Sequence, residues 1–525
     1  MIEQLMKPSR SHEDILERVD MLWLEALGDD GMTENSDFFQ LGGDSLSAVQ
    51  FVARVEEEFG VELPIEEFVQ EPTREATVRI ASRQLEKGGH RAALEAKGSN
   101  SSPLTLAQRS VMNYAGFSLQ WLYMVDGALD VQALRATIDE LVRRHSILRT
   151  RVRRRLASRR QVSQPWKAGY LRVVRLAELR GDAQRTEAER LLNQECYGPI
   201  HVNRDFPFRA MLIEMNSRKH LLGIGVHEFA ADATSEDLLA REVSTLYGMY
   251  RGNGQPDSLG DPDVQFSDYA DWNASRVTRQ VLRQQVQYWK ETLADLPATV
   301  APAIFGDELP PGEATTQTSS PSRLWTKRLE SCARELGTTP FTLLLAGFRL
   351  LLLRWGVKDT AIRVAVVTRR HPKVEEIIGP FWNNVLLRIP VEASGGFMDT
   401  VLKTRETFNG ALANNDVPLS TVLQIIPGRG DLGHGSGFPP ESIHFQFRKK
   451  ASEITLAGTR STRHQIAVPR EALSLRCTDV GSGKMELTLS SNRQCNRSEM
   501  SKALRDYETL VEQGCLRIET ESAKH

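Results

Sequence analysis

The chain has little cysteine and no long apolar run. Its five cysteines are Cys196, Cys332, Cys477, Cys495 and Cys515. They lack the paired spacing of a zinc site, so we expect reduced, structural thiols. No stretch approaches the ~20 apolar residues that cross a bilayer, and no apolar run follows a basic start. A glycine-rich phosphate loop and internal repeats are also absent. These absences predict a soluble cytoplasmic protein without a metal site.

Charge is distributed unevenly along the 525 residues. Residues 11–87 hold 19 acidic against 6 basic side chains, a net charge of −13. Because the whole chain carries −2 and residues 1–10 carry +1, residues 88–525 carry +10. A chain of this length with 40% hydrophobic residues can bury the cores of more than one domain. We therefore expect an acidic N-terminal domain that docks weakly on a basic one.

The most specific segment, residues 37–46, reads Asp-Phe-Phe-Gln-Leu-Gly-Gly-Asp-Ser-Leu. Gly42 and Gly43 permit a tight turn, and Ser45 then starts a helix at its electropositive N-terminus. Apolar residues recur at spacings of three and four from Leu46 to Phe59, which predicts an amphipathic helix. The pattern fits either an ordinary N-cap serine or a hydroxyl presented for covalent modification.

Residues 11–87 resemble an acyl or peptidyl carrier domain, a small all-α four-helix fold. The resemblance rests on a predicted first helix over residues 15–27, on segment 37–46 with its following helix, and on residues 61–68. It implies that Ser45 bears 4'-phosphopantetheine, whose thiol holds an aminoacyl or peptidyl thioester. Residues 88–103 are rich in glycine and serine, and we expect a flexible linker there.

The rest of the chain alternates predicted helices and strands, which indicates a large α/β region of two lobes. Helices are expected at residues 131–144, 235–250, 275–293 and 341–355, and strands at residues 221–226, 362–367 and 385–391. The segment 226–232, Val-His-Glu-Phe-Ala-Ala-Asp, places polar residues at the end of an apolar strand. Polar groups there face a cleft more often than a core, although a single His-Glu pair with a nearby Asp, taken alone, fits a satisfied structural histidine better.

This region resembles the condensation domains of nonribosomal peptide synthetases, because residues 227–233 are similar to their His-His-x-x-x-Asp-Gly motif. Supporting segments occur in the family's order at residues 104–108, 144–150, 206–209, 266–272, 378–384 and 415–418. The resemblance implies a chloramphenicol-acetyltransferase-like fold with a tunnel between two lobes. The N-terminal lobe would span residues 104–272 and the C-terminal lobe residues 273–520.

The resemblance also implies roles for single residues. His227 would shape the site, and Asp232 would be structural and pair with an arginine, for which we expect Arg149. The second histidine of the motif is replaced by Glu228. Asn383 and Asn384 are expected near the tunnel or buried in the lobe interface.

Glu228 leaves three interpretations open. Its carboxylate, with a pKa raised by a water-poor tunnel, could act as a general base toward the acceptor amine. It could instead orient the amine electrostatically. In the third interpretation condensation is lost and the domain serves as a docking or recruitment platform. Ester formation or cyclisation is a further alternative, while the segment 378–384 argues against epimerisation.

Domain order suggests how cargo would move. The carrier precedes the condensation region, so Ser45 would bring the donor acyl group, and a downstream carrier or a free molecule would supply the amine. The resemblance includes no adenylation domain within these 525 residues, so we expect loading in trans after modification by a phosphopantetheinyl transferase. The arginine-rich residues 149–160 lack interleaved aromatics, and we expect no nucleic acid or membrane partner.

Overall fold

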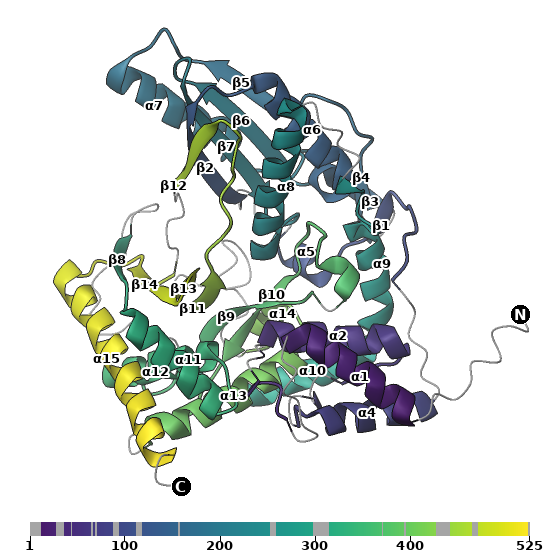
Figure 1. Cartoon of the computed structure of the whole chain (residues 1–525), viewed down its shortest axis with the longest axis vertical. Helices are drawn as coiled ribbons and strands as arrows, with labels where there is room; N and C mark the ends of the chain where they lie inside the picture. The colour runs from purple at the N-terminus through teal and green to yellow at the C-terminus, as the bar shows by residue number, and fades with distance from the viewer. Residues whose placement is uncertain are drawn as a thin grey trace, which may run out of the picture.

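In the computed structural model, the chain forms a helical domain and two larger lobes (Figure 1). The structure describes residues 12–27, 36–41, 43, 45–64, 67–68, 71–87, 94–111, 118–155, 158–252, 259–297, 314–369, 371–392, 395–426, 442–464 and 471–522. In these residues no single helix is long and apolar enough to cross a membrane. The consecutive helices Arg323–Glu335 and Pro340–Arg354, bent by 105°, reach that length and composition only together.

The helical domain contains α1 (His12–Leu27), α2 (Ser45–Phe59) and α4 (Arg74–Glu86). Its core is aromatic, because the ring of Trp23 meets those of Phe38 and Phe51 edge-on at centroid distances of 5.4 and 5.6 Å. Phe68, in a short helical turn, packs on the same cluster. The all-α fold predicted for this domain is confirmed in the described residues, in which three of the four predicted helices have defined ends.

Gly43 packs directly on this core just before α2. A Cβ atom at Gly43 would lie 2.2 Å from the ring of Phe38 and 2.7 Å from its carbonyl oxygen. The Gly43 N–H also donates to that oxygen at 3.0 Å. Gly42, Asp44 and the side chain of Ser45 lie outside the described residues. This close contact with Phe38 explains why position 43 requires a glycine.

Replacement of Gly43 by alanine should therefore destabilise the helical domain by about 1–3 kcal/mol, because the methyl group overpacks the aromatic core. Hydrogen exchange of amides in residues 12–87 of the full chain measures this loss. Gly248→Ala is the matched control, since no atom lies within 4 Å of its added Cβ. Equal protection in both variants would contradict the packing argument.

The N lobe is built on a five-stranded sheet in the order β12-β2-β7-β6-β5. The central strand β7 is almost wholly buried. Two helices, α6 and α8, cover one face, and α7 covers the other (Figure 1). The sheet and these helices are β2 (Ser118–Gly127), α6 (Val131–Arg144), β5 (Leu171–Arg175), α7 (Gly181–Leu191), β6 (Phe208–Glu214), β7 (Lys219–His227), α8 (Ala233–Arg251) and β12 (Thr459–His464).

A small three-stranded sheet, β1-β4-β3, completes the N lobe. The predicted helix over residues 275–293 is divided in two, because Thr278 caps a new helix by accepting from the Val281 N–H at 3.3 Å. The remaining N-lobe elements are β1 (Ser101–Pro103), α5 (Leu106–Val111), η2 (Ser146–Arg149), β3 (Thr150–Arg155), β4 (Ser158–Ser163), η3 (Leu192–Cys196) and α9 (Phe266–Arg276), whereas α10 (Arg279–Thr292) packs on the C-lobe core.

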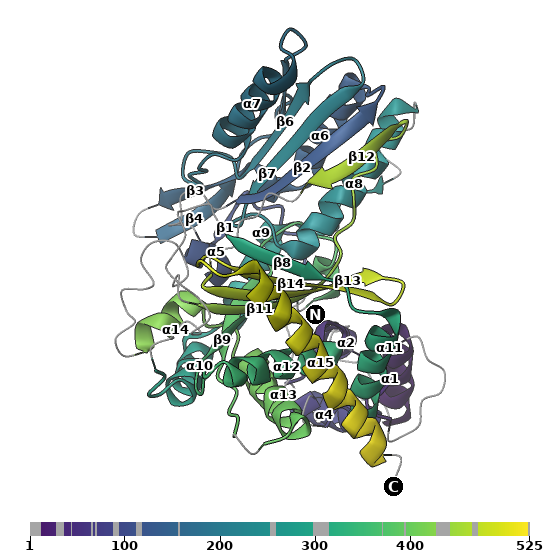
Figure 2. The same cartoon turned by 90° about the vertical axis from the view of Figure 1, so that its left-hand side faces the viewer.

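The C lobe has a mixed six-stranded sheet in the order β10-β9-β11-β13-β14-β8, with helices packed on one face (Figure 2). Its opposite face is turned toward the N lobe (Figure 1). The elements are β8 (Thr315–Ser319), α11 (Arg323–Glu335), α12 (Pro340–Arg354), β9 (Ile362–Val367), η5 (Pro372–Val374), β10 (Trp382–Leu387), α13 (Phe397–Ala413), α14 (Leu419–Ile425), β11 (Ile443–Lys449), β13 (Leu473–Gly481), β14 (Lys484–Ser491) and α15 (Arg497–Ser522).

Two segments depart from the predicted boundaries. The strand β12 belongs to the C-terminal half of the chain but pairs antiparallel with β2 of the N lobe. Residues 94–103 of the predicted flexible linker are packed on the N lobe, because Leu94 is buried and β1 pairs with β4. The linker prediction is therefore wrong for this part, whereas residues 88–93 lie outside the described residues.

Candidate functional site

The loop before Ser45 is held by its own first residue. The Asp37 carboxylate accepts the Phe39 and Gln40 N–H groups at 2.8 and 3.1 Å. Burial raises the pKa of Asp37, and these two hydrogen bonds oppose that rise. The chain then enters α2 at Ser45. The predicted position of Ser45 at the start of a helix is confirmed, while its side chain lies outside the described residues.

His227 is the last residue of β7 and is buried. Its Nδ1 accepts the Phe229 N–H at 3.0 Å, so the neutral ring carries its proton on Nε2. The next residue, Glu228, is half-buried in the turn between β7 and α8. This turn places the two residues next to each other at the end of the strand, as the motif predicted.

Asp232 caps α8, accepting from the Ser235 N–H at 2.7 Å. Its cationic partner is Arg369, whose Nη2 donates to Asp232 Oδ1 at 2.9 Å. Both side chains are almost completely buried. The expected pairing of Asp232 with Arg149 is therefore wrong. The partner comes from the C lobe, just after β9.

Arg149 is occupied elsewhere because it ends the 3₁₀ turn that follows α6. Its guanidinium donates to the carbonyl oxygens of Val142, Arg143 and Gln164 at 2.6, 3.0 and 3.0 Å. A cation at a helix C-terminus satisfies carbonyl groups that have no intrahelical partner. Arg149 thus stabilises the end of α6.

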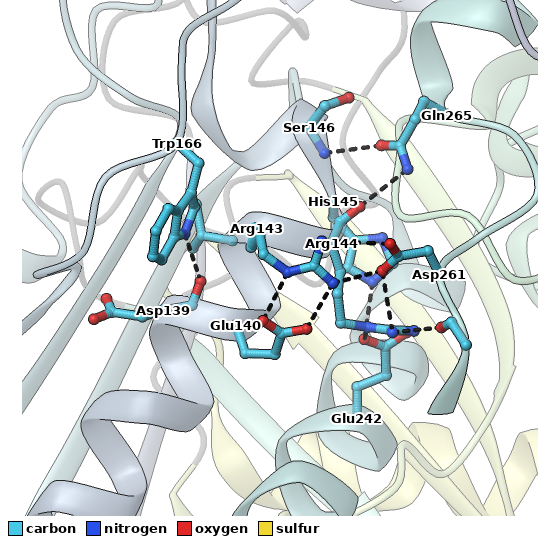
Figure 3. A network of polar contacts seen from close by, with 12 residues as sticks. Asp139, Glu140, Arg143, Arg144, His145, Ser146, Trp166, Glu242, Asp261 and Gln265 are labelled. Atoms are coloured by element: carbon cyan, nitrogen blue, oxygen red, sulfur yellow. Dashed lines mark hydrogen bonds and ion pairs between the residues drawn. The ribbon is translucent and has the colours of Figure 1, made fainter. Parts of the chain in front are cut away.

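The neighbouring residues Arg144 and His145 form a buried polar network that joins α6, α8 and α9 (Figure 3). Glu242 Oε2 lies 3.1 Å from Arg144 Nε and 2.9 Å from His145 Nε2. Burial alone would raise the pKa of Glu242, but the hydrogen bonds and charges of these two residues lower it. Gln265 donates to the Arg144 carbonyl at 3.0 Å and accepts the Ser146 N–H at 2.9 Å. This part of the segment 144–150 therefore holds helices of the N lobe together.

A charged cluster lies on the face of the C-lobe sheet that is turned toward Glu228. In β9 the alternate residues Ile362, Val364 and Val366 point into the C-lobe core, so Arg363 lies on the opposite face. Burial lowers the pKa of Arg363, and the carboxylates of Glu471 and Glu228 oppose this effect. We call Glu228, Arg363, Asn384, His444 and Glu471 the lobe-interface cluster.

Within the lobe-interface cluster, Arg363 forms an ion pair with Glu471 and donates to Asn384 Oδ1 at 3.2 Å. His444 Nδ1 lies 3.7 Å from Glu471 Oε1. Burial, reinforced by Arg363, lowers the pKa of His444 to about 3. His444 is therefore a neutral imidazole at physiological pH.

The two predicted asparagines have different surroundings. Asn383 donates to the carbonyl oxygens of Asn415 and Val417 at 2.6 and 2.8 Å, which ties β10 to the turn before α14. Asn384 is buried in the lobe-interface cluster. The amide donor of Asn383 is thus used within the fold, whereas Asn384 accompanies Arg363 opposite Glu228.

The acidic face of α2 contacts the larger region. Lys373 Nζ lies 3.7 Å from Glu57, and Arg276 lies 3.9 and 4.0 Å from Glu56 and Glu62. Arg54 approaches Glu375 at 3.8 Å. The pairs of Glu56, Glu57 and Glu62 have the polarity expected from the charge distribution, whereas the pair of Arg54 with Glu375 reverses it.

A cavity of about 950 Å³ lies in the N lobe, among β3, β5, β6 and the loop at residues 164–170. No predicted site residue lines it. Among the described residues, no group of three or more His, Cys, Asp or Glu side chains could hold a metal ion. The predicted site is thus marked by its polar contacts rather than by this cavity.

Comparison with known proteins agrees with this architecture. Residues 103–513 match the condensation domain family. The chain belongs to the condensation domain family. Residues 17–80 match the phosphopantetheine attachment site. The helical domain is accordingly a carrier domain, whose cofactor is a covalently attached 4'-phosphopantetheine.

Two relatives with curated names are much longer proteins. Bacitracin synthase 1 of Bacillus licheniformis is 24% identical over 511 residues, covering 95% of this chain and 9% of that protein. Malpibaldin synthetase of Mortierella alpina is 29% identical over 419 residues, covering 77% of this chain and 8% of that protein. The chain thus spans less than a tenth of the length of either relative.

Solved structures share the fold of the condensation domain. The X-domain from teicoplanin biosynthesis has a TM-score of 0.65 at 24% identity, covering 81% of this chain and 97% of that one. The SgcC5 protein from Streptomyces globisporus has a TM-score of 0.58 at 21% identity, covering 79% and 99%. The predicted two-lobed α/β fold is confirmed by this likeness.

Arg363, Arg369, His444 and Glu471 were not among the predicted site residues. One signal was available for Arg363, which interrupts the apolar strand Ile-Arg-Val-Ala-Val-Val. Arg369 lies two residues after the end of the same strand. His444 and Glu471 carry no comparable local signal, since only the pairing of β11 with β9 and β13 brings them to Arg363.

The pairing of Asp232 can be tested by stability. Arg369→Met should cost about 3–5 kcal/mol, because it leaves Asp232 buried without a cation. Arg149→Met should cost about 1–3 kcal/mol, since it removes only hydrogen bonds to carbonyl groups. Urea unfolding of the condensation domain compares the two, and a larger loss for Arg149→Met would overturn the assignment.

His371 should make stability depend on pH. Burial, with the charges of Lys373 and Arg276, lowers the pKa of His371 to about 4, although Glu57 lies 4.0 Å from its ring. In the unfolded chain this histidine binds a proton near pH 6.5. The contribution of His371 to the free energy of unfolding is therefore complete above pH 6.5 and is lost as the pH falls from 6.5 to 4. His371→Gln should reduce the slope over this window by up to about 1.4 kcal/mol per pH unit. Unchanged slopes in urea unfolding at pH 6.5 and 5 would refute this.

Proposed function

We propose that this chain is a carrier and condensation pair of nonribosomal peptide biosynthesis, in which Ser45 carries an aminoacyl or peptidyl group that is transferred to an amine. The observation that carries the proposal is the combination, in one chain, of a phosphopantetheine attachment domain with a condensation domain. Ser45 suits attachment because it opens α2 behind the tightly packed Gly43. The helix N-terminus also favours a negatively charged phosphate.

The acceptor amine would attack the thioester carbonyl, so that a C–N bond forms and the C–S bond breaks. The proton lost by the amine would pass to Glu228 and from there to the departing sulfur, which would leave as a thiol. Arg363 opposite Glu228 stabilises the ionised carboxylate, which favours electrostatic orientation of an ammonium group over a neutral resting acid. His227, whose Nδ1 accepts the Phe229 N–H, would stabilise the conformation of the turn that carries Glu228.

The proposal also requires partners outside this chain. A phosphopantetheinyl transferase would modify Ser45, and an adenylation domain acting in trans would load it. A downstream carrier or a free molecule would supply the amine. Ester formation or cyclisation would need only a different nucleophile at the same position.

A second candidate function is a recruitment platform without turnover. It is favoured by the lobe-interface cluster, in which Arg363 and its partners stand opposite Glu228, where family members have the second histidine. A similar fold, the X-domain of teicoplanin biosynthesis, has been solved in complex with OxyB. In this function the carrier would present its cargo to a bound partner enzyme.

One experiment separates the two functions. Ser45 is loaded with an aminoacyl-pantetheine, acceptor amines are supplied, and the mass of the intact protein is followed. Condensation predicts loss of the acyl mass with appearance of an amide, slowed about 10²-fold or more in Glu228→Ala and Glu228→Gln. Glu228→His, which restores the residue type of the family motif, is the matched control.

Three outcomes would count against parts of this proposal. Equal rates in wild type and all three Glu228 variants would exclude a role for Glu228. A stable acyl mass with every amine and alcohol acceptor, on a chain that loads normally, would favour the platform. Ser45→Ala must abolish the mass gain on treatment with a phosphopantetheinyl transferase, because another attachment residue would otherwise exist.

A further inference from the structure

The segment His371–Glu375 of the C lobe lies between the carrier domain and Asp232. On its outer side, Lys373 approaches Glu57 of α2 at 3.7 Å, and the imidazole of His371, which is neutral at physiological pH, lies 4.0 Å from the same carboxylate. Glu375 approaches Arg54 of the same helix at 3.8 Å. These contacts are longer than the ion pair of Arg54 with Glu25 inside the carrier, which measures 3.2 Å. Such long, partly exposed pairs suit reversible docking.

A second contact joins the loop before Ser45 to the C lobe. A Cβ atom on Gly337, between α11 and α12, would lie 3.2 Å from the side chain of Gln40. The charge of Arg405 on α13 acts on Asp37. The carrier therefore rests on the C lobe through α2 and through the loop that leads to Ser45.

On its inner side, the same segment holds Arg369. The Arg369 Nη1 donates to the carbonyl oxygens of Val374 and Ile377, the latter at 2.8 Å. Its Nη2 donates to Asp232 at 2.9 Å and to Ser235 Oγ at 3.2 Å. One guanidinium thus joins the backbone of the docking segment to the residue that caps α8.

The contact between Arg369 and Asp232 is incomplete. Arg369 Nε and Asp232 Oδ2 are both buried and have no hydrogen-bond partner among the described residues. A small rotation of the guanidinium would pair them and form the stronger two-bond geometry. That rotation would withdraw Nη1 from the carbonyl groups of the segment, so a two-bond arrangement would differ from the observed one in how it holds residues 374–377.

We propose that His371–Glu375 is a docking segment that couples the presence of the acidic carrier face to the position of Asp232, with Arg369 as the positioning residue. The inference rests on the proposed function, because it assumes that the motif around Asp232 is the working site. Docking fixes the carbonyl groups of the segment and holds the arrangement with a single bond to Asp232. Release of the carrier frees Arg369 to take the two-bond arrangement.

Hydrogen exchange of the apo chain tests this coupling without substrate. Glu57→Lys places like charges at 3.7 Å from Lys373 and should release the carrier. Exchange should then rise about 5-fold or more at residues 371–379 and change by as much at the Ser235 amide, which is bonded to Asp232. The double variant Glu57→Lys with Lys373→Glu should restore wild-type exchange at both.

Glu17→Lys is the matched control, because it makes the same charge change on the exposed face of α1. Faster exchange at residues 371–375 with no change at Ser235 would exclude the coupling. Identical exchange in Glu57→Lys and Glu17→Lys would exclude the docking segment itself. Neither result depends on acyl transfer, so failure of this inference is distinguishable from failure of the proposed condensation.

Discussion

The buried ion pair between Asp232 and Arg369 is the contact on which the site depends. It joins the first turn of α8 in the N lobe to the segment that leaves β9 in the C lobe. Ser235 strengthens the junction, because its Oγ accepts the Gly379 N–H at 3.0 Å. A Cβ atom on Gly379 would lie 2.2 Å from the ring of Phe266, so only glycine fits at this contact between the two lobes. The turn that carries His227 and Glu228 is anchored at its far end by this junction.

Electrostatics act in two distinct regimes in this molecule. Between the carrier and the condensation domain, the ion pairs of Glu57, Glu62 and Glu375 measure 3.7 to 4.0 Å and are partly exposed, so each contributes little and salt weakens them. Around Arg363 and Arg369, charges are buried and hydrogen-bonded, and loss of one partner leaves an uncompensated charge. The first regime allows a domain to leave and return. The second regime keeps these buried charges with their partners.

Local patterns in the sequence predicted the elements well where one signal dominated. The predicted helix 131–144 and strand 362–367 have the bounds seen in the structure, because Asp130 caps the helix and the strand is continuously apolar apart from Arg363. The pairing of Asp232 could not be predicted from the sequence, since Arg149 lies in a segment typical of the family whereas Arg369 lies in none of the recognised segments. The geometry of the turn after α6, which directs Arg149 to helix carbonyl groups, decided between them.

The strand β12 has a consequence for how the molecule is made. The N-lobe sheet begins with β2 near residue 118, yet its edge strand Thr459–His464 is synthesised more than 300 residues later. Pairing across such a sequence separation is slow, and an uncovered sheet edge invites association with other chains. A growing polypeptide would expose the edge of β2 until residues 459–464 have left the ribosome. The N-lobe sheet is therefore completed late, whereas the carrier core in the described residues draws on residues 15–85 alone.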